Sequence, residues 1–297
     1  MTIASPLSRK ATLVKLAVSQ WSGSKIDKKV TAETNERYHA DEDAGQYRKR
    51  LVLKEALEEI TQAESKIRTT FETYTKPWAR GMGILPNAVH AEFSRKIREL
   101  TREHDEAANR FERKYASHVA EMRTKLNGMF NEADYPDPEN IRARFSVSIT
   151  PYPVPDVGDF RSDVLDKNTV EDIKREMQEA SEQMLQDIMK DNVKQISEVV
   201  GHMSSKLREY GERELSDKKS GKRTFFLDSL VDNVRDLAKL LPAFNLTNDA
   251  KLDAVITRIN KELTVEDAKV LRENPEARVV VQKSAEEILK DVESLLG

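Results

Sequence analysis

The chain has 297 residues, of which 34% are charged and 38% hydrophobic, and its 49 basic and 52 acidic side chains leave a net charge of −3. This near balance argues against a chain-wide electrostatic contact with nucleic acid but leaves room for a local basic patch. The absence of cysteine excludes disulfides, thiolate metal sites and cysteine nucleophiles. Abundant charge beside few apolar residues is typical of helices that bury one narrow stripe.

Apolar stretches are short throughout the chain. None approaches the ~18 to 20 apolar residues of a membrane span. The N-terminal segment MTIASPLSRKATLVKLAVSQW has no apolar core of the kind found in a signal peptide. We therefore expect a soluble, cytoplasmic protein.

Two short segments alternate between apolar and polar residues, TLVKLAVSQW (Thr12–Trp21) and RFSVSIT (Arg144–Thr150). Strict alternation predicts half-buried strands. Because an isolated strand leaves its backbone donors unpaired, we expect these two to pair with each other.

Two long helices are predicted between these strands. Apolar residues repeat at heptad spacing from Leu53 to Trp78, and again from Phe93 to Leu126. The segment KPWARGMGILP (Lys76–Pro86) between them is predicted to be a turn. The second helix would be roughly 60 Å long at ~1.5 Å per residue. We expect a long antiparallel, coiled-coil-like helical hairpin with a small two-stranded β element at its base.

The second half of the chain is predicted to be helical. The prolines after residue 151 mark an extended connector, so the expected parts are residues 1–151, a Pro-rich linker at 152–166, and a C-terminal helical domain at 167–297. Within the last part, Gly201 is expected to bend a long helix, and Pro242 and Pro275 to separate shorter ones. The predicted fold class is therefore mainly α.

Three histidines, His90, His104 and His118, are separated by fourteen residues each time. Since this is two heptads, they share a predicted seam position and lie about 21 Å apart along the helix. Zinc–nitrogen bonds are about 2.0 to 2.1 Å long, so no two of them bind one metal ion within a chain. They either restrict helix register as polar seam positions or meet between copies in an antiparallel pair centred on His104. His39 lies among carboxylates in RYHADED, but in an expected loop, and we predict no metal site there.

No catalytic pattern is evident, and neither Gly-x-Ser-x-Gly nor His-Glu-x-x-His occurs. The segment SDKKSGKRT (Ser216–Thr224) contains Gly-Lys but lacks the other residues of a phosphate-binding loop. It remains a basic loop and a candidate phosphate contact, through Lys218, Lys219, Lys222 and Arg223. We expect no catalytic residue, cofactor or metal.

The turn of the helical hairpin carries apolar side chains at Trp78, Met82, Ile84 and Leu85. An exposed apolar tip is a candidate docking surface for another protein. The same residues also suit a plug that closes the end of the hairpin. The sequence leaves both interpretations open.

Three segments resemble a family of uncharacterised bacteriophage and bacterial proteins that carries only a domain-of-unknown-function label: LAVSQWSGSK (Leu16–Lys25), KPWARGMGILP (Lys76–Pro86) and RARFSVSITPYPVPDVGDFR (Arg142–Arg161). The resemblance covers roughly residues 10–165. Members of that family are often encoded beside a MoxR-like AAA+ ATPase and a von Willebrand factor A-type protein. The resemblance thus implies an accessory or adaptor role near such an ATPase, in the cytoplasm of a bacterium or an infected host cell, and it assigns no catalytic residues.

Three functions are compatible with these features. The favoured one is a non-enzymatic, elongated and oligomeric helical adaptor, encoded by a bacteriophage, whose partners are further copies, an AAA+ ATPase or a host protein. The second is a nucleic-acid-associated protein of phage recombination or replication that uses the basic loop, with Arg48–Arg50 as a further candidate contact. The third is a phage assembly protein or an inhibitor of host defence.

Overall fold

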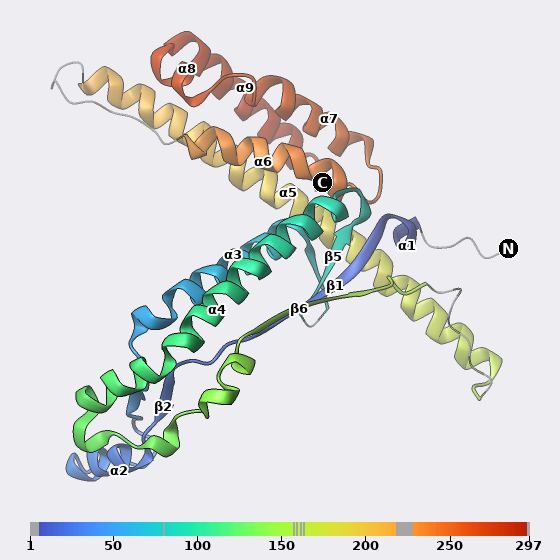
Figure 1. Cartoon of the computed structure of the whole chain (residues 1–297). Coiled ribbons are helices and arrows are strands. Elements are labelled where there is room, and N and C mark those ends of the chain that lie inside the picture. Colours follow the sequence, from blue (N-terminus) through green and yellow to red (C-terminus); the bar gives the residue numbers. More distant parts are fainter. Residues whose placement is uncertain are drawn as a thin grey trace.

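The computed structural model describes residues 6–79, 81–156, 158, 160, 162, 164–217 and 228–295. The fold is mainly α, with two small antiparallel sheets among the helices. Figure 1 shows an elongated molecule in which a helical arm extends from the larger sheet. A second helical body, built around one very long helix, crosses the opposite end of that sheet (Figure 1).

The larger sheet is built around β1 (Ala11–Ser19). As predicted, β1 pairs antiparallel with β6 (Ser146–Tyr152). The expectation of only two strands was wrong. β4 (Lys76–Ala79) and β5 (Met82–Pro86) form a β-hairpin that pairs with the other side of β1, so the strand order is β4-β5-β1-β6.

Local sequence explains why the predicted turn is a β-hairpin. The first helix ends as Thr75 adopts an extended conformation, and Pro77 disfavours helical backbone at the preceding residue. Gly81 takes a positive φ of 74° between the strands, which glycine adopts at little cost. Gly83 is required for close packing, because a Cβ there would lie 2.5 Å from the Thr75 hydroxyl oxygen.

The helical arm consists of α3 (Glu58–Tyr74) and α4 (His90–Leu126). They are antiparallel, as ion pairs along their length show: Arg110–Glu59 at 2.8 Å and Lys66–Glu103 at 3.3 Å. The prediction of two long rods was wrong for the first helix, which has 17 residues against 37 in α4. The heptad pattern before Glu58 and after Tyr74 belongs to a 3₁₀ turn (Lys54–Leu57) and to β4.

Irregular chain covers the part of α4 beyond α3. Phe111 and Tyr115 of α4 pack with Trp21 and Phe145, with ring centroids 5.4 to 6.2 Å apart. The Tyr115 hydroxyl donates to the carbonyl oxygen of Pro136 at 2.9 Å. These contacts bring the segment before β6 onto the helix.

A small second sheet, β2 (Ser24–Ile26) with β3 (Arg48–Arg50), lies at the far end of the arm. Between its strands lies a helix that the sequence did not predict, α2 (Lys28–Arg37), and the side chain of Asp27 caps it by accepting from the Val30 N–H. None of the side chains in α2 is buried, so no apolar periodicity revealed it.

Among its described residues, the second body contains a short π-helical segment (Ile259–Leu263) and five α-helices: α5 (Lys167–Asp217), α6 (Ser229–Phe244), α7 (Ala250–Arg258), α8 (Ala268–Glu273) and α9 (Pro275–Glu293). Their facing sides form the largest apolar core among the described residues. Pro275 opens α9, as a helix start permits. The expected break at Pro242 was wrong, because this residue lies inside α6.

The two faces of β1 belong to different apolar clusters. Val14 packs with Ile67 and Phe93 of the arm. The adjacent Leu13 points to the other face, where it packs with Ile188 of α5. The short helix α1 (Pro6–Lys10) contributes to that second cluster. The sheet therefore joins the arm to the second body.

The close approach at Gly83 gives a stability prediction. In Gly83→Ala, the new methyl group collides with the Thr75 side chain, and we expect the free energy of unfolding to fall by about 1 to 3 kcal/mol. In the control Gly201→Ala, within α5, a Cβ meets no atom within 4 Å, and the higher helix propensity of alanine should raise stability by about 1 kcal/mol. Urea denaturation measures both, and equal stability of the two variants would contradict the prediction.

Candidate functional site

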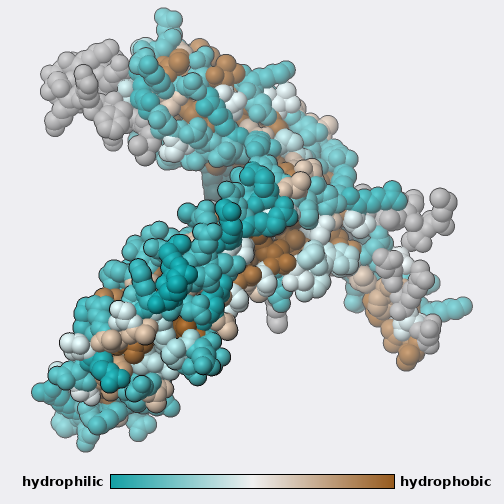
Figure 2. Space-filling view, viewed as in Figure 1, coloured by the Kyte–Doolittle hydropathy of each residue, from teal (hydrophilic) through white to brown (hydrophobic). Residues whose placement is uncertain are grey.

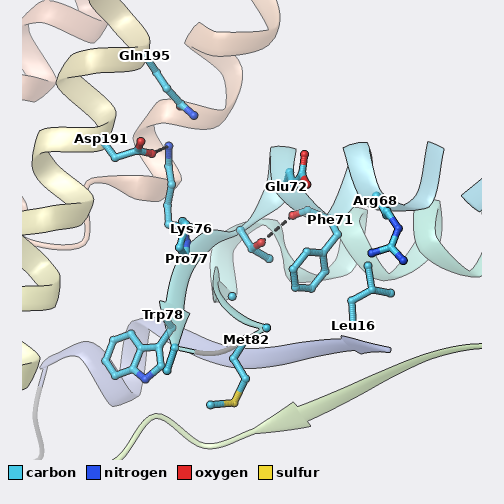
Figure 3. A pocket seen from close by; sticks show the side chains of 14 residues that line it. Leu16, Arg68, Phe71, Glu72, Lys76, Pro77, Trp78, Met82, Asp191 and Gln195 are labelled. Carbon is cyan, nitrogen blue, oxygen red and sulfur yellow. Dashed lines mark hydrogen bonds and ion pairs between the residues drawn. The ribbon is translucent and has the colours of Figure 1, made fainter. Parts of the chain in front are cut away.

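A groove lies where the end of α3, the β4–β5 hairpin and α5 meet; we name it the junction groove. Its volume is about 660 Å³. Figure 3 shows α5 on one side and α3 on the other, with β4 between them. The side chains that line it include Leu16, Arg68, Phe71, Glu72, Lys76, Trp78, Met82, Asp191 and Gln195.

The groove is amphipathic. Leu16, Phe71, Trp78 and Met82 supply apolar surface. Two basic and two acidic side chains line it as well, so their formal charges cancel: Arg68, Lys76, Glu72 and Asp191. Such a lining suits an amphipathic ligand of low net charge better than a polyanion.

Lys76 is the charged group at the centre of this site. Its side chain is only 3% exposed, and its ammonium donates to an Asp191 carboxylate oxygen at 2.5 Å. The ammonium also lies 5.1 Å from the ring centroid of Phe244. Burial lowers the pKa of Lys76 below its ordinary value, and the ion pair with Asp191 only partly offsets this. Lys76 thus links β4 to α5, although burial of its positive charge is unfavourable.

The four residues predicted for the hairpin tip lie in two different environments. Trp78 and Met82 line the junction groove. Ile84 and Leu85 are fully buried in the sheet, so they are not part of any docking surface. The pairing of β5 with β1 explains their burial.

The three histidines of α4 do not share one environment. His90 is exposed, His104 is 0% exposed, and the ring of His118 stacks on Phe111 with centroids 5.5 Å apart. A straight α-helix drifts by about 20° per heptad relative to a 3.5-residue repeat, which rotates the outer two histidines away from the position of His104. The expectation of one shared seam position was therefore wrong for His90.

His104 is buried between α3 and α4, and neither of its ring nitrogens has a hydrogen-bond partner among the described residues. Its nearest acidic atom is an Asp105 carboxylate oxygen, 3.9 Å from Nδ1. Burial lowers the pKa of the imidazole, assisted by Arg142 and opposed by Asp105 and Glu64. Burial thus favours the neutral ring in the folded protein.

The remaining sequence-based candidates are the basic loop and the surroundings of His39. Lys218, Lys219, Lys222 and Arg223 lie outside the described residues. Within the described part of the chain, no group of three or more His, Asp or Glu side chains is placed to hold a metal ion, and this includes the surroundings of His39. Among the helices described, none is both long enough and apolar enough to cross a membrane.

Sequence reasoning missed the pairing of Lys76 with Asp191. The two residues are 115 positions apart, and neither belongs to a catalytic or ligand-binding motif. Gln195, one turn after Asp191, looked like one of many polar residues on a charged helix. The sequence did contain a weak indication that Lys76 is unusual, because this charged residue lies between an apolar heptad pattern and the pair Pro77–Trp78.

Comparisons of the chain with protein-family models, with curated proteins and with solved structures found no match. The assignment of a function consequently depends on the geometry of the site.

The Lys76–Asp191 pair predicts asymmetric mutant effects. In Asp191→Asn the buried ammonium loses its counter-charge, and we expect a loss of about 1 to 3 kcal/mol in the free energy of unfolding. In Lys76→Met the buried charge disappears, while Asp191, whose side chain is 40% exposed, stays hydrated; stability at pH 7 should be equal or higher. Chemical denaturation of both variants checks this, and a larger loss in Lys76→Met would contradict it.

His104 predicts a pH dependence. Because its pKa is lowered in the folded state, the unfolded chain binds more protons below the ordinary histidine pKa of about 6.5. His104 therefore contributes to the stability of the folded protein above that pH, and this contribution is lost as the pH falls. His104→Leu should weaken this acid-side loss, whereas the exposed control His90→Gln should not. Thermal melts between pH 7 and 5 that are parallel in wild type and His104→Leu would exclude the effect.

Proposed function

We propose that this protein is a non-enzymatic, elongated helical adaptor that binds a partner protein in the junction groove. The observation that carries the proposal is the position of an amphipathic groove of about 660 Å³ where the arm and the second body meet. Pockets at such junctions are common binding sites, and partly apolar linings with a few fixed polar groups give them specificity.

The groove supports recognition of an apolar anchor from the partner. Trp78 and Met82 offer a flat aromatic ring and a flexible thioether, the side-chain types that adapt to apolar partners. Gln195 and Asp191 on α5 and Glu72 on α3 offer hydrogen-bonding groups beside this surface. A partner segment would thus contact the arm and the second body together.

An AAA+ ATPase of the MoxR-like class is the partner that we propose. Its support is the resemblance of roughly residues 10–165 to a family often encoded beside such ATPases. A bacterial or phage-infected cytoplasm follows from the same resemblance. The elongated shape suits an adaptor, since it separates the groove from the far end of the arm (Figure 1).

Trp78 provides a direct test of groove binding. The chain has two tryptophans, and the other, Trp21, packs on α4 away from the groove. In a Trp21→Phe background, titration with a purified MoxR-like AAA+ ATPase should change Trp78 fluorescence. Gln195→Arg, which fills the groove, should weaken binding by about tenfold or more (~1.4 kcal/mol).

The matched control for this titration is Gln178→Arg, at an exposed position of α5 that does not line the groove. It should bind as tightly as the parent. Equal affinity of both arginine variants would contradict the groove as the binding site. No binding by any of the proteins would contradict the ATPase as the partner.

A further inference from the structure

The second feature of functional interest is the open edge of the larger sheet. β6 is the last strand in the order β4-β5-β1-β6, and among the described residues it pairs only with β1. Figure 1 shows β6 running along the outside of the sheet. An edge strand presents unpaired N–H and C=O groups that can pair with another chain.

This edge lacks the usual protection against pairing. No charged residue occurs from 145 to 155, in a chain that is 34% charged. Proteins commonly guard edge strands with charges, prolines, bulges or short length. The opposite edge, β4, is protected against pairing with another strand. It has only four residues, which include Pro77, and it lies in the junction groove between α3 and α5. β6 has seven residues, and its one proline, Pro151, is next to its end.

Apolar side chains are left half-covered beside this edge. Val147 and Ile149 of β6, together with Leu100 of α4, are only partly buried at the margin of the cluster that joins the arm to the sheet. Figure 2 shows an apolar area between the arm and the strands in an otherwise mostly hydrophilic surface. A further strand alongside β6 would extend cover over this area.

The sequence of β6 is self-complementary in one antiparallel register. With a two-fold axis at Ser148, Val147 lies opposite Ile149 of the second copy, and Ser146 lies opposite Thr150. β-branched apolar pairs and Ser–Thr pairs both stabilise neighbouring strands. Pro151, which cannot donate a hydrogen bond, falls outside this pairing.

Shifting the axis by one residue gives poorer pairs. An axis at Ile149 places Pro151 opposite Val147, within the ladder. An axis at Val147 places Phe145, which is buried in its own chain, opposite Ile149. An axis at Ser148 avoids both problems. We propose that two copies of this chain pair antiparallel through β6 with Ser148 at the two-fold axis, forming one continuous eight-stranded sheet.

This dimer is independent of the proposed groove function. The groove is at β4, on the opposite edge of the sheet, so both grooves remain open in the pair. Because the axis is perpendicular to the sheet, the half-covered apolar faces of both copies lie on the same side. Failure of the dimer would leave the groove proposal standing, and the reverse also holds.

Cysteine cross-linking tests the register, because the natural chain contains no cysteine. Ser148 is exposed, and directly opposite residues have Cβ atoms about 4.5 to 5.5 Å apart. Ser148→Cys should therefore yield a covalent dimer on mild oxidation or with a short bis-maleimide. Ser146→Cys alone should not, since its copy would be roughly 13 Å away along the strand. A mixture of Ser146→Cys and Thr150→Cys should cross-link.

Charge substitution at the same position tests the association without covalent chemistry. Size exclusion with light scattering should give a dimer for the wild type. Ser148→Lys and Ser148→Glu each place like charges at the axis and should be monomers, while their equimolar mixture should dimerise again. Circular dichroism equal to wild type controls for folding, which the exposed position favours.

Three results would overturn the proposal. The first is that the wild-type protein stays monomeric at all concentrations and the Ser148→Cys variant does not cross-link. The second is a dimer that persists in both charge variants, since it would use another surface. The third is efficient cross-linking of Ser146→Cys alone, which would exclude this register.

Discussion

The structure depends on one strand, β1, that has neighbours on both edges and a core on each face. β1 pairs with β5 along one edge and with β6 along the other. This pairing places residues 82–86 and 146–152, which precede and follow α4 in the sequence, in the same sheet. Adjacent residues then serve opposite faces: Val14 packs with the arm, and Leu13 packs with α5. Because strand side chains alternate, a slip of one residue would exchange these two faces and disrupt both clusters.

The junction groove is a consequence of this arrangement. β4 reaches α5 only because β5 holds it beside β1, and Lys76 then meets Asp191 across the gap. A second link joins the arm to α6, where Glu92 accepts hydrogen bonds from Tyr74 and Lys239 at 2.8 and 2.9 Å. Hydrogen bonding to both groups lowers the pKa of Glu92 to about 2, so this link stays charged at physiological pH. Polar contacts thus hold the two helical parts at a defined position beside a groove that they both line.

Elements with strong periodicity were predictable from the sequence, and those fixed by distant contacts were not. The alternation of residues in β1 and β6 predicted both strands and their pairing, and the heptads after Phe93 predicted α4. The β4–β5 hairpin was missed because Phe71, Tyr74 and Trp78 continue the helical spacing, while Gly81 and Gly83 act through backbone conformation and close packing. Two residues of the expected apolar tip, Trp78 and Met82, line the groove, but Asp191 on its other side comes from α5, more than a hundred positions away. No local pattern encodes such an approach.

Native-state hydrogen exchange tests the central role of β1 most directly. If β1 joins both cores, the amides of residues 11–19 are released only by global unfolding. Their exchange free energy should equal the unfolding free energy from denaturation, and protection of α3, α4 and the sheet-facing part of α5 near Ile188 should be lost with them. Exchange of β1 amides through a lower-energy local opening, while α4 and α5 remain protected, would contradict this account.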